Sequence, residues 1–273
     1  MADAFRTQTG VPSGEFDFDH RPETDQSFEN ALAKARAGER LTVEDGIELL
    51  TTGTDLDGID HERLEKVVDA ADARRQSVVG DEVTIVANLN NNVTSACDTG
   101  CLFCNYRDNA HTFEAGTDEA PRGFTKTPAE SREIVADAVE RGIYEVTSVS
   151  GLHPALVLDE EHREILEAAD HPRYKPPSAY EKDPGTYAEQ LETMSIDGVH
   201  LHSMTPEEAH HAARGTDWDF ETVYRKLMDA GLNSVPGTAA EILVDEVRDV
   251  ICPGKIDTGT WMNAMEGAAA AGL

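Results

Sequence analysis

The chain shows two different hydrophobic patterns, one before residue 80 and one after it. Between residues 27 and 80, apolar side chains recur at helical spacing, and Thr42 followed by Asp45 is typical of a capped helix start. A third helix is predicted over His61–Ala73. Residues 1–26 are polar and contain Gly and Pro. These patterns predict a helical region over residues 27–80, preceded by a loose acidic arm over residues 1–26.

From Glu82 onward, short apolar runs alternate with amphipathic segments, which indicates a parallel sheet covered by helices. The predicted strands are Val83–Ala87, Tyr144–Val149, Gly198–Ser203 and a short one at Asn233–Val235. The predicted helices are Pro128–Arg141, Glu160–Ala169, Pro206–Ala213, Glu221–Ala230, Ala239–Val250 and Thr258–Ala271. The segment Asp170–Pro184 contains four prolines and is predicted to be a loop.

Four predicted strands are too few to close a barrel, which normally takes about eight strands and 250 residues. Either the sheet is open, or the sequence is a fragment of a longer barrel. The last predicted helix runs into Gly272, where a further strand is expected. The fragment is therefore favoured, and residues 81–273 are interpreted as an α/β barrel domain without its last strands.

The composition and the net charge limit the classes of protein to which this chain can belong. The chain of 273 residues is 39% hydrophobic, as is typical of a globular protein, but its formal net charge is −30. Such an excess of carboxylates disfavours nucleic acid and anionic membranes as partners, because both need basic surfaces. The acidic residues are spread along the chain, which favours a surface adapted to a salty cytoplasm over an acidic tail. No stretch approaches the roughly 20 apolar residues of a membrane span, and no secretory signal is recognisable, so we expect a cytoplasmic protein.

Three of the four cysteines lie close together, at Cys97, Cys101 and Cys104. Clustered cysteines in a chain without an export signal indicate metal binding rather than disulfides. Three thiolates can ligate three irons of a [4Fe–4S] cubane, and the fourth iron can then bind the amine and carboxylate of an amino acid. Gly100 relieves crowding in the loop, and Phe103 offers a ring beside a bound adenine. The spacing therefore predicts an open [4Fe–4S] site at the mouth of the sheet.

A zinc site is the alternative for these thiols. Structural zinc takes four ligands, usually in two separated pairs, whereas Cys252 lies far along the chain without a neighbouring cysteine. Cys252 is therefore interpreted as a small buried apolar side chain. His111 could complete a zinc site, so zinc stays open as an alternative on this pattern.

The cysteine loop resembles the signature of the radical S-adenosylmethionine (radical SAM) superfamily. The surrounding motifs are similar to those of the deazaflavin (FO) synthase subunits and their relatives in menaquinone synthesis. The motifs that carry the resemblance are Asn88-x-Asn90-x-Asn92-x-Thr94, Ser150-Gly-Leu-His-Pro154, His200-Leu-His202, Pro236–Leu243, and Val250–Pro253 with Lys255. The last two are similar to the branch that joins tyrosine to a ribitylaminouracil. Two departures stand out, because Ser150 replaces a glycine and Asn105-Tyr106-Arg107 replaces a more usual Ala-Phe.

The resemblance implies a partial (β/α)6-type radical SAM barrel, similar to a TIM barrel and incomplete at the C-terminus, with an N-terminal helical extension. It implies S-adenosylmethionine as a cofactor beside the [4Fe–4S] cluster, and a transferase reaction. Cleavage of the cofactor would give methionine and a 5′-deoxyadenosyl radical, which would oxidise L-tyrosine. The 4-hydroxybenzyl group would then add to 5-amino-6-(D-ribitylamino)uracil. A second FO synthase subunit would close the deazaflavin ring of coenzyme F-420, and a ferredoxin or flavodoxin would supply electrons.

The resemblance and the strand pattern together assign roles to further residues. The residues expected to contact the cofactor are Phe103, Ser150, Gly151 and His153. The residues expected to bind substrate are Asn88, Asn90, Asn92, His200, His202 and Glu241. Alternation along a strand would place the three asparagines and Thr94 on one face, and a polar row of this kind suits a substrate cavity better than packing. The alternatives are a solvated edge strand, satisfied core histidines and, for Glu241, a helix-start carboxylate. The catalytic residue stays unassigned.

Two other functions stay open at this level. A futalosine-cyclising radical SAM enzyme of menaquinone synthesis shares most of these motifs, although it tends to carry glycines where this chain has Thr238 and Ala239. From another class, the chain could be a truncated, non-catalytic metal-binding remnant. Product analysis separates the first alternative, and metal analysis with a cofactor-cleavage assay separates the second.

Overall fold

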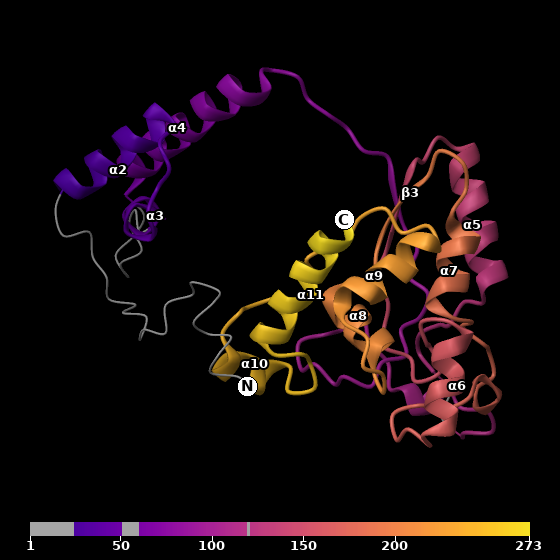
Figure 1. The fold of residues 1–273 in the computed structure, drawn as a ribbon. Coiled ribbons are helices and arrows are strands. Elements are labelled where there is room, and N and C mark those ends of the chain that lie inside the picture. The colour runs from indigo at the N-terminus through magenta and orange to yellow at the C-terminus, as the bar shows by residue number, and fades with distance from the viewer. Residues whose placement is uncertain (1–24, 51–59, 119–120) are drawn as a thin grey trace. The chain divides into compact units, whose positions relative to one another are not determined.

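The computed structural model describes residues 25–50, 60–118 and 121–273 (Figure 1). The chain divides into two compact units between Ile85 and Val86. The described part of the first unit is helical, and the second unit contains the sheet and the cysteine loop. Residues 1–24, most of the predicted N-terminal arm, lie outside the described residues. The domain limits at residues 26 and 80 stay a prediction.

The described residues of the first unit form the helices α2 (Asp25–Ala37), α3 (Val43–Leu50) and α4 (His61–Val79). The predicted cap of α3 is confirmed, because the N–H of Asp45 donates to Thr42 Oγ1 at 3.2 Å and the N–H of Thr42 donates to the Asp45 carboxylate at 2.9 Å. The helices bury a small apolar core made of Phe28, Ala31, Leu32, Leu49 and Ala70. The predicted helical region is therefore present.

In the described part of the second unit, three strands form a parallel sheet: β1 (Asn88–Asn90), β2 (Glu145–Ser148) and β3 (His200–Ser203), in the order β1-β2-β3. The register aligns Leu89 with Val146 and Val146 with Leu201. Because all three strands run in the same direction, their carboxyl ends meet at one edge of the sheet. The loops that follow the strands are thereby brought together.

Helices connect the strands, as the alternating pattern predicts. They are α5 (Pro128–Glu140), α6 (Glu160–Ala168), α7 (Tyr187–Met194), α8 (Pro206–Ala213), α9 (Phe220–Asp229), α10 (Asp245–Ile251) and α11 (Thr258–Ala271). Two short 3-10 turns, η1 (Ala110–Phe113) and η2 (Pro177–Ala179), lie in the connecting loops. The α/β class with a parallel sheet is confirmed.

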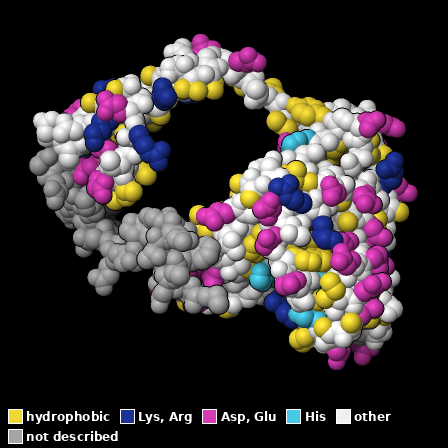
Figure 2. Space-filling model, in the orientation of Figure 1, with side chains coloured by type: hydrophobic (Ala, Val, Ile, Leu, Met, Phe, Trp, Pro, Cys, Tyr) yellow, Lys and Arg dark blue, Asp and Glu magenta, His cyan; other side chains and the backbone are white. Residues whose placement is uncertain are grey.

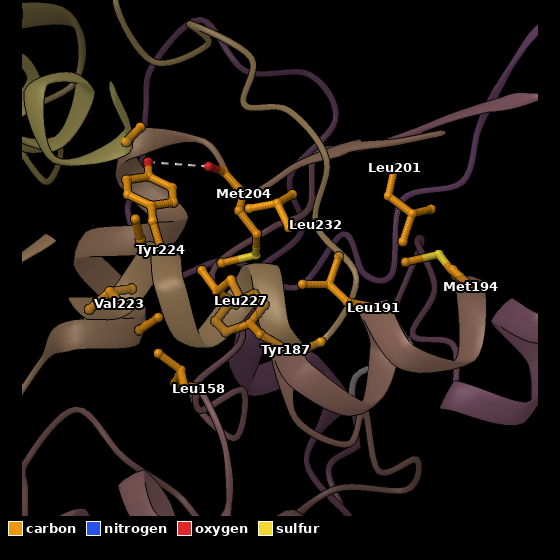
Figure 3. Packing of buried hydrophobic residues seen from close by; sticks show 14 of the residues in the cluster. Leu158, Tyr187, Leu191, Met194, Leu201, Met204, Val223, Tyr224, Leu227 and Leu232 are labelled. Atoms are coloured by element: carbon orange, nitrogen blue, oxygen red, sulfur yellow. Dashed lines mark hydrogen bonds between the residues drawn. The ribbon is translucent and has the colours of Figure 1, made fainter. Parts of the chain in front are cut away.

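One face of the sheet packs against helices and forms the main core. Leu89, Val146 and Leu201 contribute the strand side of this core. Figure 3 shows residues of α7 and α9 meeting there, including Leu191, and the Tyr224 hydroxyl donating to the carbonyl of Met204 at 3.4 Å. Burial of this apolar face fixes which way every strand side chain points, because alternate residues must face the other side.

Three predicted elements differ from the structure. Val83–Ala87 is not a strand, and backbone pairing with β2 begins only where Ala87 O accepts the N–H groups of Tyr144 and Glu145 at 3.3 Å. Asn233–Val235 contributes an isolated parallel bridge, between Ser234 and His202. The helix predicted over Ala239–Val250 begins at Asp245 in α10.

Helix α7 was not predicted from the sequence. It follows Pro184, which closes the proline-containing loop, and it begins with a capping box in which Thr186 and Glu189 satisfy each other's N–H groups. The pattern Thr186-x-x-Glu189 is the signal that could have identified it. This helix supplies much of the core, since Tyr187, Leu191 and Met194 are all buried.

On the face that Figure 2 shows, acidic side chains are spread over several elements of the described residues. Few Lys and Arg side chains lie between them, in keeping with the 53 acidic and 23 basic residues of the chain. Within the described residues, every helix is too short or too polar to cross a membrane.

Candidate functional site

The cysteine loop lies after β1, at the edge where the carboxyl ends of the strands meet. Its base is closed by backbone hydrogen bonds, because the N–H of Cys97 donates to Asp108 O at 3.0 Å and the N–H of Asp108 donates to Ser95 O at 2.8 Å. The Asp108 carboxylate accepts the N–H groups of Arg122 and Gly123 at 2.6 and 3.2 Å. A loop of this kind presents its thiols from a fixed base.

All four cysteines are free. Cys101 is buried, whereas Cys97 and Cys104 are half-buried. Burial raises the pKa of the Cys101 thiol to about 11, the positive charge of Lys255 opposes this, and the Cys97, Cys252 and Cys104 thiols add to it. The loop thiols therefore lie close enough to influence one another electrostatically. Iron ligation would deprotonate them, because only the thiolate binds metal.

The donor set fits a cluster better than a single ion. In the part of the chain that the structure describes, no three His, Cys, Asp or Glu side chains converge as one metal ion requires. The Nδ1 of His111, the candidate fourth zinc ligand, instead lies 3.2 Å from a carboxylate oxygen of Glu114. A [4Fe–4S] cubane takes one thiolate per iron, so its ligands surround the cluster without meeting at one point. The closed loop offers three free thiols as donors of this kind.

The loop after β2 packs directly on the cysteine loop. Gly151 donates its N–H to Thr94 O at 2.8 Å, and a Cβ atom on it would lie 2.3 Å from Ala96 O and 3.2 Å from Cys97 Cβ. The N–H of Asp98 donates to Leu152 O at 3.4 Å. Only glycine allows this approach, and the structure thus brings Gly151 beside Cys97, as the resemblance implies.

Both the backbone N–H and the side-chain hydroxyl of Ser150 form hydrogen bonds. Its N–H donates to the Glu208 carboxylate at 3.1 Å, and its Oγ accepts the N–H of Val93 at 2.8 Å. Glu208 also caps α8 by accepting the N–H and Oγ1–H of Thr205. Burial raises the pKa of Glu208 to about 7 despite these donors. Sequence reasoning missed Glu208, although Thr205-x-x-Glu208 is a recognisable capping box.

His153 is fully buried in the same loop. Its Nδ1 accepts the N–H of Ala155 at 3.1 Å, its ring lies 4.3 Å from the Tyr180 ring, and its Nε2 has no partner. Burial, with a smaller effect of Arg214, lowers its pKa to about 4. The imidazole is therefore neutral near pH 7. It supports the loop through its hydrogen bond to the N–H of Ala155 and its contact with the Tyr180 ring.

The sheet face opposite the helices is polar. The register places Asn88, Glu145 and His200 in one row across the strands, and Asn90, Thr147 and His202 in a second row. Parallel sheets are normally apolar on both faces, so these rows are unusual. These residues are exposed or half-buried, and the second row lies nearer the carboxyl ends of the strands, where the cysteine loop begins. A face of this composition can bind a polar molecule through several hydrogen bonds.

Several of these side chains already bond to one another. Asn88 Nδ2 donates to Glu145 Oε1 at 2.7 Å and to Thr147 Oγ1 at 2.8 Å. His200 Nε2 and His202 Nδ1 each lie 2.7 Å from Ser234 Oγ. A hydroxyl has one proton and two lone pairs, so Ser234 donates to at most one of the two rings and at least one ring N–H donates to it. The two predicted histidines thus share one partner.

The predicted asparagine row does not continue beyond β1. The strand ends at Asn90, and the Asn92 Oδ1 turns to accept the N–H of Val149 at 2.8 Å. Thr94 is buried and its Oγ1 contacts Thr125 Oγ1 at 2.8 Å. Alternation along a strand predicted Asn92 and Thr94 on the polar face. In the structure their side chains instead form hydrogen bonds that support the neighbouring chain. The backbone leaves the extended conformation because the chain must turn into the cysteine loop.

Glu241 lies in a loop, not on a helix. Its carboxylate pairs with Lys255 at 2.5 Å, and the Lys255 ammonium lies 5.5 Å from the centroid of the Phe103 ring. Phe103 is 45% exposed and stands between two of the cysteines in sequence, so its ring is free to contact a ligand. The structure therefore brings Glu241 and Phe103 together through Lys255, which the sequence motif included without a role.

Comparison with known proteins fits this arrangement. Residues 91–273 match the family model described as the radical SAM superfamily. A protein of Haloarcula marismortui named 5-amino-6-(D-ribitylamino)uracil–L-tyrosine 4-hydroxyphenyl transferase is 67% identical over 97% of this chain and 59% of its own length. Proteins of the same name from Halobacterium salinarum and a Cyanothece species are 67% and 35% identical, over 94% and 92% of this chain. The chain spans 57% to 59% of the length of these relatives.

Solved structures with a similar fold are distant in sequence. HydG, a maturase of the [FeFe]-hydrogenase, superposes with a TM-score of 0.57 at 17% identity, over 92% of this chain and 45% of its own. Methylornithine synthase (PylB) superposes with a TM-score of 0.54 at 17% identity, over 89% of this chain and 56% of its own. At this identity the likeness concerns the fold.

Proposed function

The chain belongs to the radical SAM superfamily, and from this premise we propose that it carries the activity that joins the 4-hydroxybenzyl group of L-tyrosine to 5-amino-6-(D-ribitylamino)uracil. The product would be the precursor of the deazaflavin FO, the chromophore of coenzyme F-420. A [4Fe–4S] cluster and S-adenosylmethionine are the cofactors of this superfamily, and therefore of this chain. The proposal on substrates rests on the relatives of the same printed name, two of them 67% identical.

One structural observation carries the proposal. A closed loop with three free thiols lies at the carboxyl edge of a parallel sheet, next to a sheet face lined by amide, hydroxyl, carboxylate and imidazole groups. We infer that Cys97, Cys101 and Cys104 hold the cluster and leave one iron for the cofactor. When bound, the cluster and S-adenosylmethionine supply a 5′-deoxyadenosyl radical for hydrogen abstraction.

The chain's own residues position the reactants. Gly151 lets the second loop approach the cysteine loop, and Ser150 is fixed by Glu208, so the backbone there can bind the methionine end of the cofactor. Phe103 offers its exposed ring to the adenine. Holding the reacting atoms in one geometry is the main contribution such a protein makes to the rate.

The polar sheet face would bind the substrates. The uracil and ribityl groups present many donors and acceptors, which the rows through Asn88 and Asn90 can match. The pair His200 and His202, joined through Ser234, can hold a proton at either ring and pass it along the shared hydroxyl. We propose binding roles for Asn88, Asn90, His200 and His202, and a supporting role for Asn92.

The same proposal implies protein partners and a cellular location for this chain. A low-potential one-electron protein such as a ferredoxin or flavodoxin would reduce the cluster, and a second FO synthase subunit would complete the deazaflavin ring. We propose a cytoplasmic location in a halophilic cell. The net charge of −30 and the relatives from Haloarcula and Halobacterium support that setting.

The test uses protein reconstituted anaerobically with iron and sulfide and reduced with dithionite. With S-adenosylmethionine, tyrosine and the ribitylaminouracil, mass spectrometry should detect 5′-deoxyadenosine and the coupled product. Product from the futalosine derivative alone would assign the menaquinone-pathway activity instead. Bound zinc without sulfide or cofactor cleavage would indicate a metal-binding remnant.

Cys97→Ala tests the ligand set. We expect loss of cluster absorbance and at least a hundredfold loss of 5′-deoxyadenosine formation, because the remaining two thiolates cannot hold a site-differentiated cluster. Cys252→Ala is the matched control, since this cysteine is free and buried outside the loop and should leave the cluster in place. Unchanged cofactor cleavage by Cys97→Ala would refute the assignment.

A further inference from the structure

The segment 251–255 forms a wall against the cysteine loop. The N–H of Leu102 donates to Ile251 O at 2.8 Å. A Cβ atom on Gly254 would lie 2.2 Å from Thr99 O, so the two backbones are in direct contact there. These two contacts come from residues on either side of Cys101. The wall is therefore fixed relative to the loop that presents the thiols.

Lys255 extends from this wall over the loop. Its ammonium lies 5.5 Å from the Phe103 ring centroid and 2.5 Å from Glu241 Oε1. The Lys255 and Glu241 side chains are only 13% and 25% exposed, so water screens their charges weakly. The charge of Lys255 is felt at the Cys101 thiol, where it opposes the effect of burial. Glu241 also lies 3.9 Å from the buried guanidinium of Arg248, so this carboxylate faces two cations, of which Lys255 is the one beside Phe103 and Cys101.

The position of Glu241 is built into the fold. Ala239 and Glu241 both have positive φ, of 79° and 39°, which non-glycine residues rarely adopt. The buried guanidinium of Arg248 donates to the carbonyls of Ala239, Ala240 and Ile242, at 3.1, 2.7 and 3.2 Å. Arg248 also donates to Ile256 O at 2.6 Å, which ties this loop to Lys255's own segment. Arg248 therefore fixes the backbone on both sides of the ion pair, and this backbone holds the Glu241 carboxylate beside Lys255.

We propose that Lys255 and Glu241 form a charge pair that sets the reduction potential of the cluster. The inference rests on the proposed cluster at Cys97, Cys101 and Cys104. Reduction adds one electron from a low-potential one-electron donor to the cluster, and no bond forms or breaks in that step. A nearby cation stabilises the added negative charge, whereas a nearby anion destabilises it. Lys255 makes reduction easier, and Glu241 limits that effect.

The two members of the pair should have opposite effects when neutralised. In Lys255→Met the midpoint potential should become more negative by about 59 mV. For one electron this is about a tenfold lower ratio of reduced to oxidised cluster at a fixed solution potential. In Glu241→Gln it should become less negative. Potentials are measured by anaerobic titration with dithionite and mediators, followed by electron paramagnetic resonance of the reduced cluster, so the readout is independent of turnover.

Lys226→Met is the matched control. Lys226 also pairs with carboxylates, Asp159 at 3.0 Å and Glu161 at 2.7 Å, and also lies over an aromatic ring, that of Trp218 at 4.7 Å. It faces α6 instead of the cysteine loop, so its loss should leave the potential unchanged.

The outcomes separate this inference from the proposed function. Equal potentials in wild type, Lys255→Met and Glu241→Gln overturn the charge pair while the cluster assignment stands. Shifts of the same sign in both variants overturn it as well. A wild-type protein that forms no [4Fe–4S] cluster overturns both. If Lys255→Met does not retain its cluster, the direction of the Glu241→Gln shift decides the question alone.

Discussion

Glu208 is the residue whose ionisation should be visible in the stability of the fold. It is buried, and burial raises its pKa from 4.5 to about 7. The folded state then binds more protons than the unfolded state between these values, so the free energy of unfolding falls as pH rises through that window. A shift of this size corresponds to roughly 3 kcal/mol. The contribution is fully present below about pH 4.5 and is lost above about pH 7.

Glu208→Gln should remove this pH dependence. Denaturant unfolding of both proteins at constant high salt should show the wild type losing up to roughly 3 kcal/mol relative to the variant between about pH 4.5 and 7. Glu130→Gln is the control, because Glu130 occupies the same capping position in α5 but its pKa is lowered, mainly by Lys182. Parallel curves for wild type and Glu208→Gln would show that Glu208 ionises normally.

For single residues, the sequence indicates the proposed ligands better than the residues that support them. Cys97, Cys101 and Cys104 are proposed from the sequence because cluster ligation needs one residue type at a tight spacing. Arg248 and Glu208 are not, because each acts through backbone groups that only the fold brings near: the carbonyls of residues 239, 240 and 242 for Arg248, and the N–H of Ser150 for Glu208. From the sequence alone, a charged residue that is buried in the fold cannot be distinguished from one on the surface, because its partners are not known.

The contact between the wall 251–255 and the cysteine loop depends on one glycine. Gly254→Ala places a methyl group 2.2 Å from Thr99 O, and both sides of this contact are backbone, so one segment must move. Overpacking of this kind typically costs about 1–3 kcal/mol. We expect a lower melting temperature and a clear loss of iron and sulfide bound per chain after reconstitution, because the loop that presents the thiols is displaced.

Gly259→Ala is the control for that substitution. Gly259 lies five residues further on, in the first turn of α11, and the nearest atom to its added Cβ is Asp257 Oδ1 at 3.6 Å. A helical alanine is normally favoured over glycine by about 1 kcal/mol, so this variant should be at least as stable as the wild type. Equal iron content in the two variants would mean that the wall does not position the loop.

Elements were predictable where local signals were strong. Pro206–Ala213 and Thr258–Ala271 occur with the predicted bounds, since each follows a side chain that caps its first turn. The helix predicted from Ala239 begins only at Asp245. The carbonyls of Ala239, Ala240 and Ile242 accept from the Arg248 side chain instead of from helical N–H groups, and Ala239 and Glu241 have positive φ. The pattern of apolar residues cannot report such a bond.

For the whole molecule, the parallel sheet and its polar face were predictable together. Alternating Asn88 and Asn90, and His200 and His202, indicate two strands with a polar side, and the register brings these residues into the same rows through β2. The sequence does not show where β1 ends. The chain turns at Asn90 to form the cysteine loop, so Asn92 and Thr94 support the backbone instead of extending the polar row.

The acidic surface should make the stability of the whole protein depend on salt. With 53 acidic and 23 basic residues, the folded chain carries strong self-repulsion. The screening length falls from about 10 Å at 0.1 M to about 3 Å at 1 M salt, so added KCl should relieve this repulsion. If screening gains about 2–3 kcal/mol, the melting temperature should rise by roughly 5–10 °C over that range. Differential scanning fluorimetry against KCl concentration measures it.

A charge-reduced variant separates screening from general effects of salt on water. Exposed glutamates on five helices can be changed to glutamine without touching the site: Glu133, Glu164, Glu192, Glu246 and Glu266. Because this removes repulsion directly, the variant should melt higher than the wild type at 0.1 M KCl and gain less on going to 1 M. If salt acted only by strengthening apolar burial, both proteins would gain equally. A smaller gain in the variant therefore identifies the carboxylate field as the cause, whereas equal gains would place the salt dependence in the core.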